Sequence, residues 1–201
     1  MFPLLYITLF TVFATQVSAQ NRVAVAHLMT GNINGSVLFT ETAQGLHVTG
    51  SITGLPEGRY GFHVHALGDV STCNAAGPHF NPDGDRHGGR DHSVRHVGDL
   101  GNVVFVGNEN AVATLDFVDN IITLRGRNNI LGRTLVLHEQ EDDLGLGNHE
   151  LSHISGNAGP RAACGVIGIV SPSEPWNSAG TITTPRLSLF ALSLIFVYVR
   201  L

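Results

Sequence analysis

The chain has 201 residues, with 16 Asp and Glu against 11 Arg and no Lys, which gives a formal net charge of −5. This length suits a single domain with a buried core. The acidic balance argues against nucleic acid as a partner, because phosphate binding requires clustered positive charge. Eleven histidines are a high count for such a chain.

The first 19 residues are apolar and carry small residues at the two positions that a signal peptidase reads. A polar break, Gln20-Asn21-Arg22, follows them. We therefore expect residues 1–19 to be a secretory signal peptide that is removed. The alternative is a buried first strand or helix.

The C-terminal end is apolar for thirteen residues, 187–199, fewer than the roughly 20 that a spanning helix needs. Small residues at 177–180 and a polar spacer at 181–186 precede it. This order is typical of a glycosylphosphatidylinositol (GPI) anchor signal. We predict removal of residues 178–201 with attachment at Asn177, or else at Ser178. The alternative is a tail anchor or an end that is merely processed. The remaining domain, residues 20–177, has a formal charge of −7.

Short runs of alternating apolar and polar residues recur through this domain, bounded by Gly, Asn, Asp and Pro. They lie at residues 22–28, 35–40, 45–52, 113–118 and 133–138. This pattern predicts an antiparallel all-β sandwich or barrel. Residues 65–101 and 139–161 are too long and irregular to be turns, and we expect them to be two functional loops.

Two further signals fit a secreted protein. The two cysteines, Cys73 and Cys164, predict one disulfide in an oxidising compartment, with two buried thiols as the alternative. The single glycosylation sequon is Asn34-Gly35-Ser36, and we expect N-glycosylation of Asn34 in an exposed turn.

Residues 61–101 contain a dense set of candidate metal ligands. Imidazole is the commonest protein ligand for zinc, copper and iron, and zinc also accepts carboxylate. His63 and His65 are spaced to point to one face of a strand, with Phe62 and Val64 facing the other side. The block predicts a metal site made from His63, His65, His79, His87, His96 and Asp99. His27, His47 and His92 have no partner at ligand spacing, and we interpret them as ordinary surface histidines.

Four motifs of this domain are specific. They are Gly-Phe-His-Val-His at residues 61–65, Gly-Pro-His-Phe-Asn-Pro at 77–82, Arg-His-Val-Gly-Asp-Leu-Gly-Asn at 95–102 and Ala-Cys-Gly-Val-Ile-Gly at 163–168. Together with a strand that ends at His138, they make almost the whole domain resemble the Cu/Zn superoxide dismutase family. The resemblance implies an eight-stranded antiparallel Greek-key β-barrel that usually forms a homodimer.

The resemblance also implies the roles of individual residues. Copper would be held by His63, His65, His79 and His138. Zinc would be held by His79, His87, His96 and Asp99, so that His79 bridges the two metals. Asp142 would accept hydrogen bonds from His63 and His87, and Arg161 would guide the anionic substrate to copper.

The activity implied is dismutation of superoxide to oxygen and hydrogen peroxide, with copper as the redox centre and zinc as its structural partner. An enzyme with these processing signals would act outside the cell, attached to the outer face of the plasma membrane by its lipid anchor. The alternative is a non-catalytic extracellular copper- and zinc-binding module or copper carrier.

The second long loop departs from the family pattern. Leu151 and Ile154 stand where the family has charged residues that steer superoxide inward, and the chain has no Lys at all. We therefore expect weaker electrostatic steering. The same loop contains His149-Glu-Leu-Ser-His153, which fits a zinc-protease pattern. That chemistry needs a stable helix and a third ligand, and the surrounding glycines leave room for a short turn of helix at most.

Overall fold

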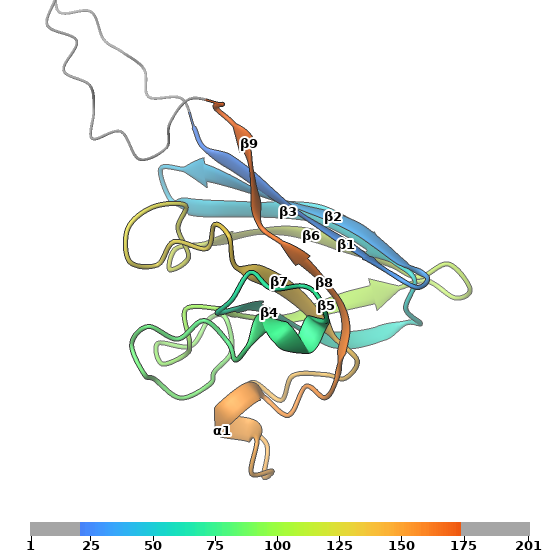
Figure 1. Cartoon of the computed structure of the whole chain (residues 1–201). Coiled ribbons are helices and arrows are strands. Elements are labelled where there is room, and N and C mark those ends of the chain that lie inside the picture. The colour runs from blue at the N-terminus through green and yellow to red at the C-terminus, as the bar shows by residue number, and fades with distance from the viewer. Residues whose placement is uncertain (1–20, 174–201) are drawn as a thin grey trace, which may run out of the picture.

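The computed structural model describes residues 21–173. The predicted signal peptide, the proposed anchor sites Asn177 and Ser178, and the apolar C-terminal tail lie outside the described residues. Figure 1 shows a β-barrel from which loops and a short helix project at one end. In chain order the elements are β1 Val23–Thr30, β2 Ile33–Thr42, β3 Gly45–Thr53, β4 Gly58–His65, η1 Cys73–Ala76, β5 Asp99–Val106, β6 Val112–Asp119, β7 Thr134–His138, α1 Ser152–Ser155, β8 Arg161–Val166 and β9 Gly168–Ser171.

The strands form one antiparallel sheet in the order β8-β7-β4-β5-β6-β3-β2-β1-β9. Its two end strands, β8 and β9, are separated in the chain only by Ile167. This one stretch therefore pairs with β7 on one side and β1 on the other, and it closes the barrel. The connections β3–β4 and β6–β7 each pass over two strands, as in a Greek key. Residues 21–173 contain nine strands where eight were expected, because the last one divides at Ile167.

The predicted alternation is visible in β2. Ile33, Val37 and Phe39 are buried in the barrel core, while Asn34 and Leu38 between them are exposed. All five alternating runs of the sequence coincide largely with strands. Asn34 is exposed as expected, but it lies within β2 and not in a turn, because it pairs with neighbours on both β1 and β3.

Strand β4 has two different faces, and both are buried. Phe62 and Val64 point into the barrel core, whereas His63 and His65 lie on the opposite face under the long connections. These connections are residues 66–98 and 139–160, and each contains only one short helix. Because the two loops cover the outer face of β4, the barrel provides a buried polar space outside its core.

The predicted disulfide is present between Cys73 and Cys164, 91 residues apart in sequence. It ties η1, in the first long loop, to strand β8. As expected, residues 149–153 do not form the helix that a zinc-protease site needs, because α1 begins only at Ser152 and has four residues. Within residues 21–173, no helix has the length and apolar character needed to cross a bilayer.

Candidate metal centre

The candidate ligands come from three neighbouring strands and the first long loop. His63 and His65 lie on β4, Asp99 begins β5 and His138 ends β7. The loop between β4 and β5 carries His79, His87 and His96, and all seven residues are buried. Because β4 lies between β5 and β7 in the sheet, the strand ends bring these side chains to one place.

The first group of donor atoms comes from histidines alone. One nitrogen from each of its members lies within 4.8 Å of the others. The Nδ1 of His65 donates to the carbonyl of Gly77 at 2.7 Å, and the Nδ1 of His138 donates to that of Gly159 at 3.0 Å. Their Nε2 atoms therefore face each other, 3.4 Å apart. The members of this group are His63, His65, His79 and His138.

Asp142 joins this group to the second. Its Oδ2 accepts a hydrogen bond from His63 Nε2 at 2.8 Å, and its Oδ1 accepts one from His87 Nε2 at 2.7 Å. Asn102 fixes Asp142 by two reciprocal hydrogen bonds with its main chain, each of 2.8 Å. Gly156 packs so closely that a Cβ there would lie 1.8 Å from Asp142 Oδ1, so only glycine fits.

The second group contains a carboxylate. Asp99 Oδ1 lies 2.8 Å from His79 Nδ1 and 3.2 Å from His96 Nδ1, and Asp99 Oδ2 lies 3.0 Å from His87 Nδ1. Four donor atoms that all lie within 4.8 Å of one another come from His63, His79, His87 and Asp99. This group therefore includes His63, whereas the family resemblance implied His96 as the fourth zinc ligand. His96 nevertheless adjoins it, with its Nδ1 3.4 Å from His79 Nδ1.

Two buried ring nitrogens in these groups, His63 Nδ1 and His79 Nε2, have no hydrogen-bond partner, and a third, His87 Nδ1, has only its 3.0 Å contact with Asp99 Oδ2. A buried polar atom without a partner costs about 1–3 kcal/mol. All three nitrogens belong to the two groups of candidate ligands. A metal ion in each group would use them, so the residues present fit two metals. The first group is all imidazole, which suits copper, and the second adds the carboxylate that zinc accepts.

Burial is the main cause of the protonation state in the first group. It lowers the pKa of all four histidines, and that of His138 falls to about 4. Neutral imidazole is the form that binds metal. These four side chains are therefore in the ligand form at neutral pH.

In the second group, hydrogen bonds outweigh burial in setting the pKa values. Burial alone would raise the pKa of Asp99, but hydrogen bonds from three histidines hold it well below its usual range. Burial would likewise lower the pKa of His87, yet hydrogen bonds to Asp142 and Asp99 outweigh burial and raise it to about 9. Asp99 is therefore ionised and is ready to bind a cation.

Arg161 places a positive charge beside the first group. It begins β8 directly opposite His138. Its guanidinium donates to the carbonyls of Cys73 and Gly77, and the Gly77 carbonyl also accepts from His65. Burial, His79 and this charge together lower the pKa of His65. The side chain is thus held in a fixed position next to the all-histidine group.

A closed β-barrel whose loops cover two adjoining donor groups, with His63 and His79 common to both, defines a dinuclear metalloprotein. Residues 33–167 match the family model described as copper/zinc superoxide dismutase. The chain belongs to the Cu/Zn superoxide dismutase family.

Individual relatives agree with this family. Over 140 residues the chain is 51% identical to the extracellular Cu-Zn superoxide dismutase of Drosophila melanogaster, which covers 68% of this chain and 76% of the relative. Among solved structures, a crystal structure of the clock protein EA4 is similar with a TM-score of 0.72 and 48% identity. That match covers 78% of this chain and all of the other.

Several residues that orient the candidate ligands were not predicted from sequence. Asn102 is the last residue of the motif at 95–102, and its place in that motif was the one sequence signal that could have indicated a role. The close contact of Gly156 with Asp142 depends on how the second long loop folds over the site. The carbonyls of Gly77 and Gly159 have no side-chain signature, and sequence alone could not identify them as acceptors.

We expect the substitution Asp142→Asn to weaken metal binding by about 10- to 100-fold, the usual cost of losing a ligand's hydrogen-bond partner. An asparagine amide can accept from one histidine but presents an N–H to the other, so one ring loses its orientation. Competition with a chelator would measure both metal affinities. Asp143→Asn is the matched control, because Asp143 bonds Ser152 and Gly145 and no histidine. Unchanged affinities in Asp142→Asn would contradict this role.

Proposed function

We infer that this protein disproportionates superoxide to oxygen and hydrogen peroxide, with copper in the all-histidine group and zinc in the carboxylate group. The observation that carries this assignment is the pair of adjoining groups that share His79. Its Nδ1 contacts Asp99 in the second group, while its Nε2 is buried without a hydrogen-bond partner and is free to serve the first. In this proposal copper is bound by His63, His65, His79 and His138, and zinc by His79, His87, His96 and Asp99.

The choice of His96 over His63 for zinc follows from counting nitrogens. The Nε2 of His63 is occupied by Asp142, so only its Nδ1 remains, and one nitrogen serves one metal. The copper group needs that nitrogen as its fourth donor. His96 Nδ1 points at Asp99 and His79, which supports its place as the fourth zinc ligand.

Copper, when bound, supplies a one-electron redox couple, whereas zinc has no redox chemistry. The protein's own residues supply the proton and bind the substrate anion. His79 can hold a proton at Nε2 while Nδ1 stays directed at the zinc side, which makes it the natural proton donor to reduced substrate. Two guanidinium nitrogens of Arg161 are anchored on carbonyls, and the remaining N–H groups can bind a small anion. A planar guanidinium suits such an anion better than an ammonium group does.

A non-catalytic metal carrier is the alternative function. It would need the ligands but not a fixed cation beside them. Arg161, held opposite His138, therefore favours the enzyme.

The substitution His138→Ala tests the enzymatic proposal. His138 belongs only to the copper group, so we expect zinc to remain bound while dismutation falls. Loss of a ligand should cost more than the ~10- to 100-fold cost of losing a ligand's partner. Pulse radiolysis on metal-loaded protein measures the rate, and His92→Ala, at an exposed histidine outside both groups, is the control. Full copper and zinc content without dismutation in the unmodified protein would favour the carrier instead.

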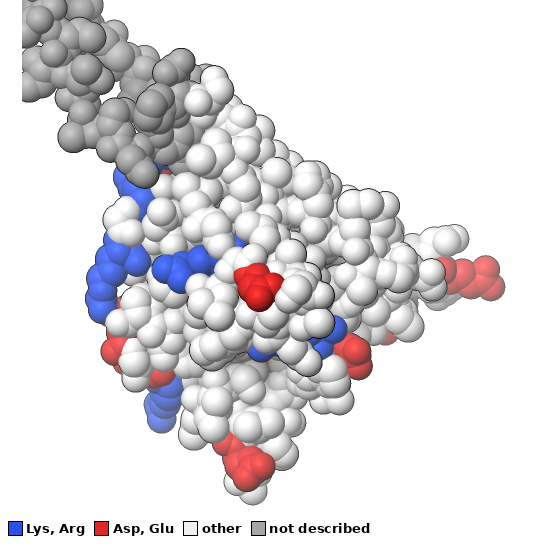
Figure 2. All heavy atoms as spheres, viewed as in Figure 1, with Lys and Arg blue, Asp and Glu red and all other residues white. Residues whose placement is uncertain are grey.

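The rim beside the site is largely uncharged. Residues 144–160 include Glu150 and no Lys or Arg. Leu146 is 74% exposed and Ile154 63% exposed, with Leu151 also at the surface. Much of the face shown in Figure 2 is likewise uncharged, with acidic and basic side chains scattered over it. We propose that attraction of superoxide depends on Arg161 more than on charges of the rim.

We therefore expect a dismutation rate that changes by less than about twofold between ~0.01 M and ~0.15 M ionic strength, since salt screens mainly exposed charges. The variant Ile154→Lys adds an exposed cation to the same rim and should increase both the rate at low salt and its salt dependence. Pulse radiolysis over a salt series measures both. A steep fall of the unmodified protein's rate with salt would refute weak steering.

We also propose a homodimer. The carbonyl of Leu67 accepts from the Thr134 hydroxyl at 2.7 Å, and Thr134 pairs with Val166 across β7 and β8. Leu67 and Val166 are exposed, as is Ile169 on the following strand. Exposed apolar residues gathered over neighbouring elements are typical of a protein–protein interface.

We place the protein outside the cell, on its membrane surface. The Drosophila relative is named as extracellular, and the disulfide Cys73–Cys164 suits an oxidising compartment. Exposure of Asn34 on β2 leaves its side chain available for a glycan. The GPI anchor at Asn177 is proposed from the sequence pattern alone.

Phosphatidylinositol-specific phospholipase C tests the anchor. A protein held only by the glycolipid should be released from cells into the medium with its dismutase activity intact. A variant truncated after residue 177 should be secreted without treatment. Retention of the full-length protein on treated cells would contradict the anchor.

A further inference from the structure

Arg95 is a buried arginine that neither proposed metal group uses. Its side chain and that of Asp119 are each 1% exposed, and they form an ion pair with 2.6 Å between Arg95 Nη2 and Asp119 Oδ2. Nη1 of the same guanidinium donates to the main-chain carbonyl of Asp99. Arg95 also directly precedes His96 in the chain. One side chain thus adjoins two of the proposed zinc ligands.

This guanidinium lies where two neighbouring strands separate. β5 and β6 pair only beside their hairpin, at Phe105↔Ala113 and Val106↔Val112. The same register, continued along both strands, would bring Asp99 opposite Asp119. The guanidinium bonds both residues, so it connects the strands at the end where their ladder pairs are missing. Asp99, the proposed carboxylate ligand of zinc, is the first residue of β5 at this end.

Both carboxylate oxygens of Asp119 accept hydrogen bonds, which fix its side chain in place. Its Oδ1 accepts from the main-chain N–H groups of Ile121 and Ile122, at 2.8 and 3.0 Å, and its Oδ2 accepts from Arg95. Ile122 is buried in the barrel core. Asp119 therefore connects the guanidinium to the core through the start of the β6–β7 connection.

We propose that Arg95, held by Asp119, is a positioning residue that fixes His96 and Asp99 for zinc. The planar guanidinium reaches two acceptors at once, on β5 and β6, which an ammonium group does less well. Displacement of the Asp99 carbonyl would move the carboxylate of that residue, and displacement of Arg95 would move the adjacent His96. This inference rests on the proposed assignment of both residues to zinc.

The substitution Arg95→Lys tests the proposal in the full chain. Lysine keeps a positive charge beside Asp119 but gives up the planar two-point contact. We expect zinc affinity to fall by about 10- to 100-fold and copper affinity to change by less than about threefold, because only the zinc side is repositioned. Competition with a chelator measures each metal separately. Co²⁺ bound in place of zinc should give a shifted visible absorption spectrum.

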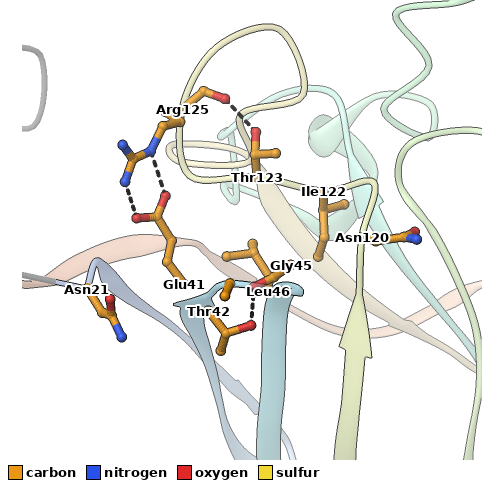
Figure 3. A pocket seen from close by; sticks show the side chains of 10 residues that line it. Asn21, Glu41, Thr42, Gly45, Leu46, Asn120, Ile122, Thr123 and Arg125 are labelled. Carbon is orange, nitrogen blue, oxygen red and sulfur yellow. Dashed lines mark hydrogen bonds and ion pairs between the residues drawn. The ribbon is translucent and has the colours of Figure 1, made fainter. Parts of the chain in front are cut away.

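Arg125 provides a matched control. Figure 3 shows its guanidinium in a two-point contact with Glu41. Both residues line a pocket of about 440 Å³. Arg125 is also in the β6–β7 connection, but its ion pair is exposed and bonds no candidate ligand. Arg125→Lys should leave the affinities for zinc and copper and the Co²⁺ spectrum unchanged.

A second variant covers the case in which Arg95→Lys does not fold. Asp119→Asn keeps an oxygen for the N–H groups of Ile121 and Ile122 while weakening the hold on Arg95, and it should show the same selective loss of zinc. Unchanged zinc binding in a folded variant, equal loss of both metals, or failure of both variants to fold would overturn the proposal and leave Arg95 a structural residue. If His96→Ala bound zinc normally, the zinc assignment itself would be wrong.

Discussion

The orientation of the buried histidine rings is the constraint on which the rest of this structure depends. An imidazole has two nitrogens on one rigid plane, so a hydrogen bond at one of them fixes the direction of the other. The carbonyls of Gly77 and Gly159 fix His65 and His138, and the two oxygens of Asp142 fix one ring on each side. His79 is the exception, because both of its nitrogens face the candidate metal groups.

These acceptors are useful only if the loops that carry them are fixed to the barrel. The Cys73–Cys164 disulfide joins the loop containing Gly77 to β8, and Arg161 on the same strand donates to two carbonyls of that loop. β8 also pairs with β7, which ends in His138. Candidate ligands from β4, β7 and the first loop are thus fixed to one another, and so is Arg161 beside the all-histidine group.

Strand periodicity allowed much of this arrangement to be predicted from sequence. The spacing of His63 and His65 requires them to share a face of β4, and the structure places them there with Phe62 and Val64 in the core. The division of the last strand at Ile167 could not be read from sequence, because it depends on pairing with β1 and β7 at once. Main-chain acceptors were also missed, since any residue type can supply a carbonyl.

The buried site and its exposed rim obey different physical requirements. Inside, two unpaired ring nitrogens and a carboxylate kept ionised by its neighbours leave little freedom, because removing a further partner would leave another buried polar group without a hydrogen bond. On the rim, Leu146 and Ile154 contact solvent, and a change there alters only the field that an approaching anion meets. The chemistry therefore depends on residues that the fold holds rigidly. The rate at which substrate arrives depends on residues that can vary without disturbing the fold.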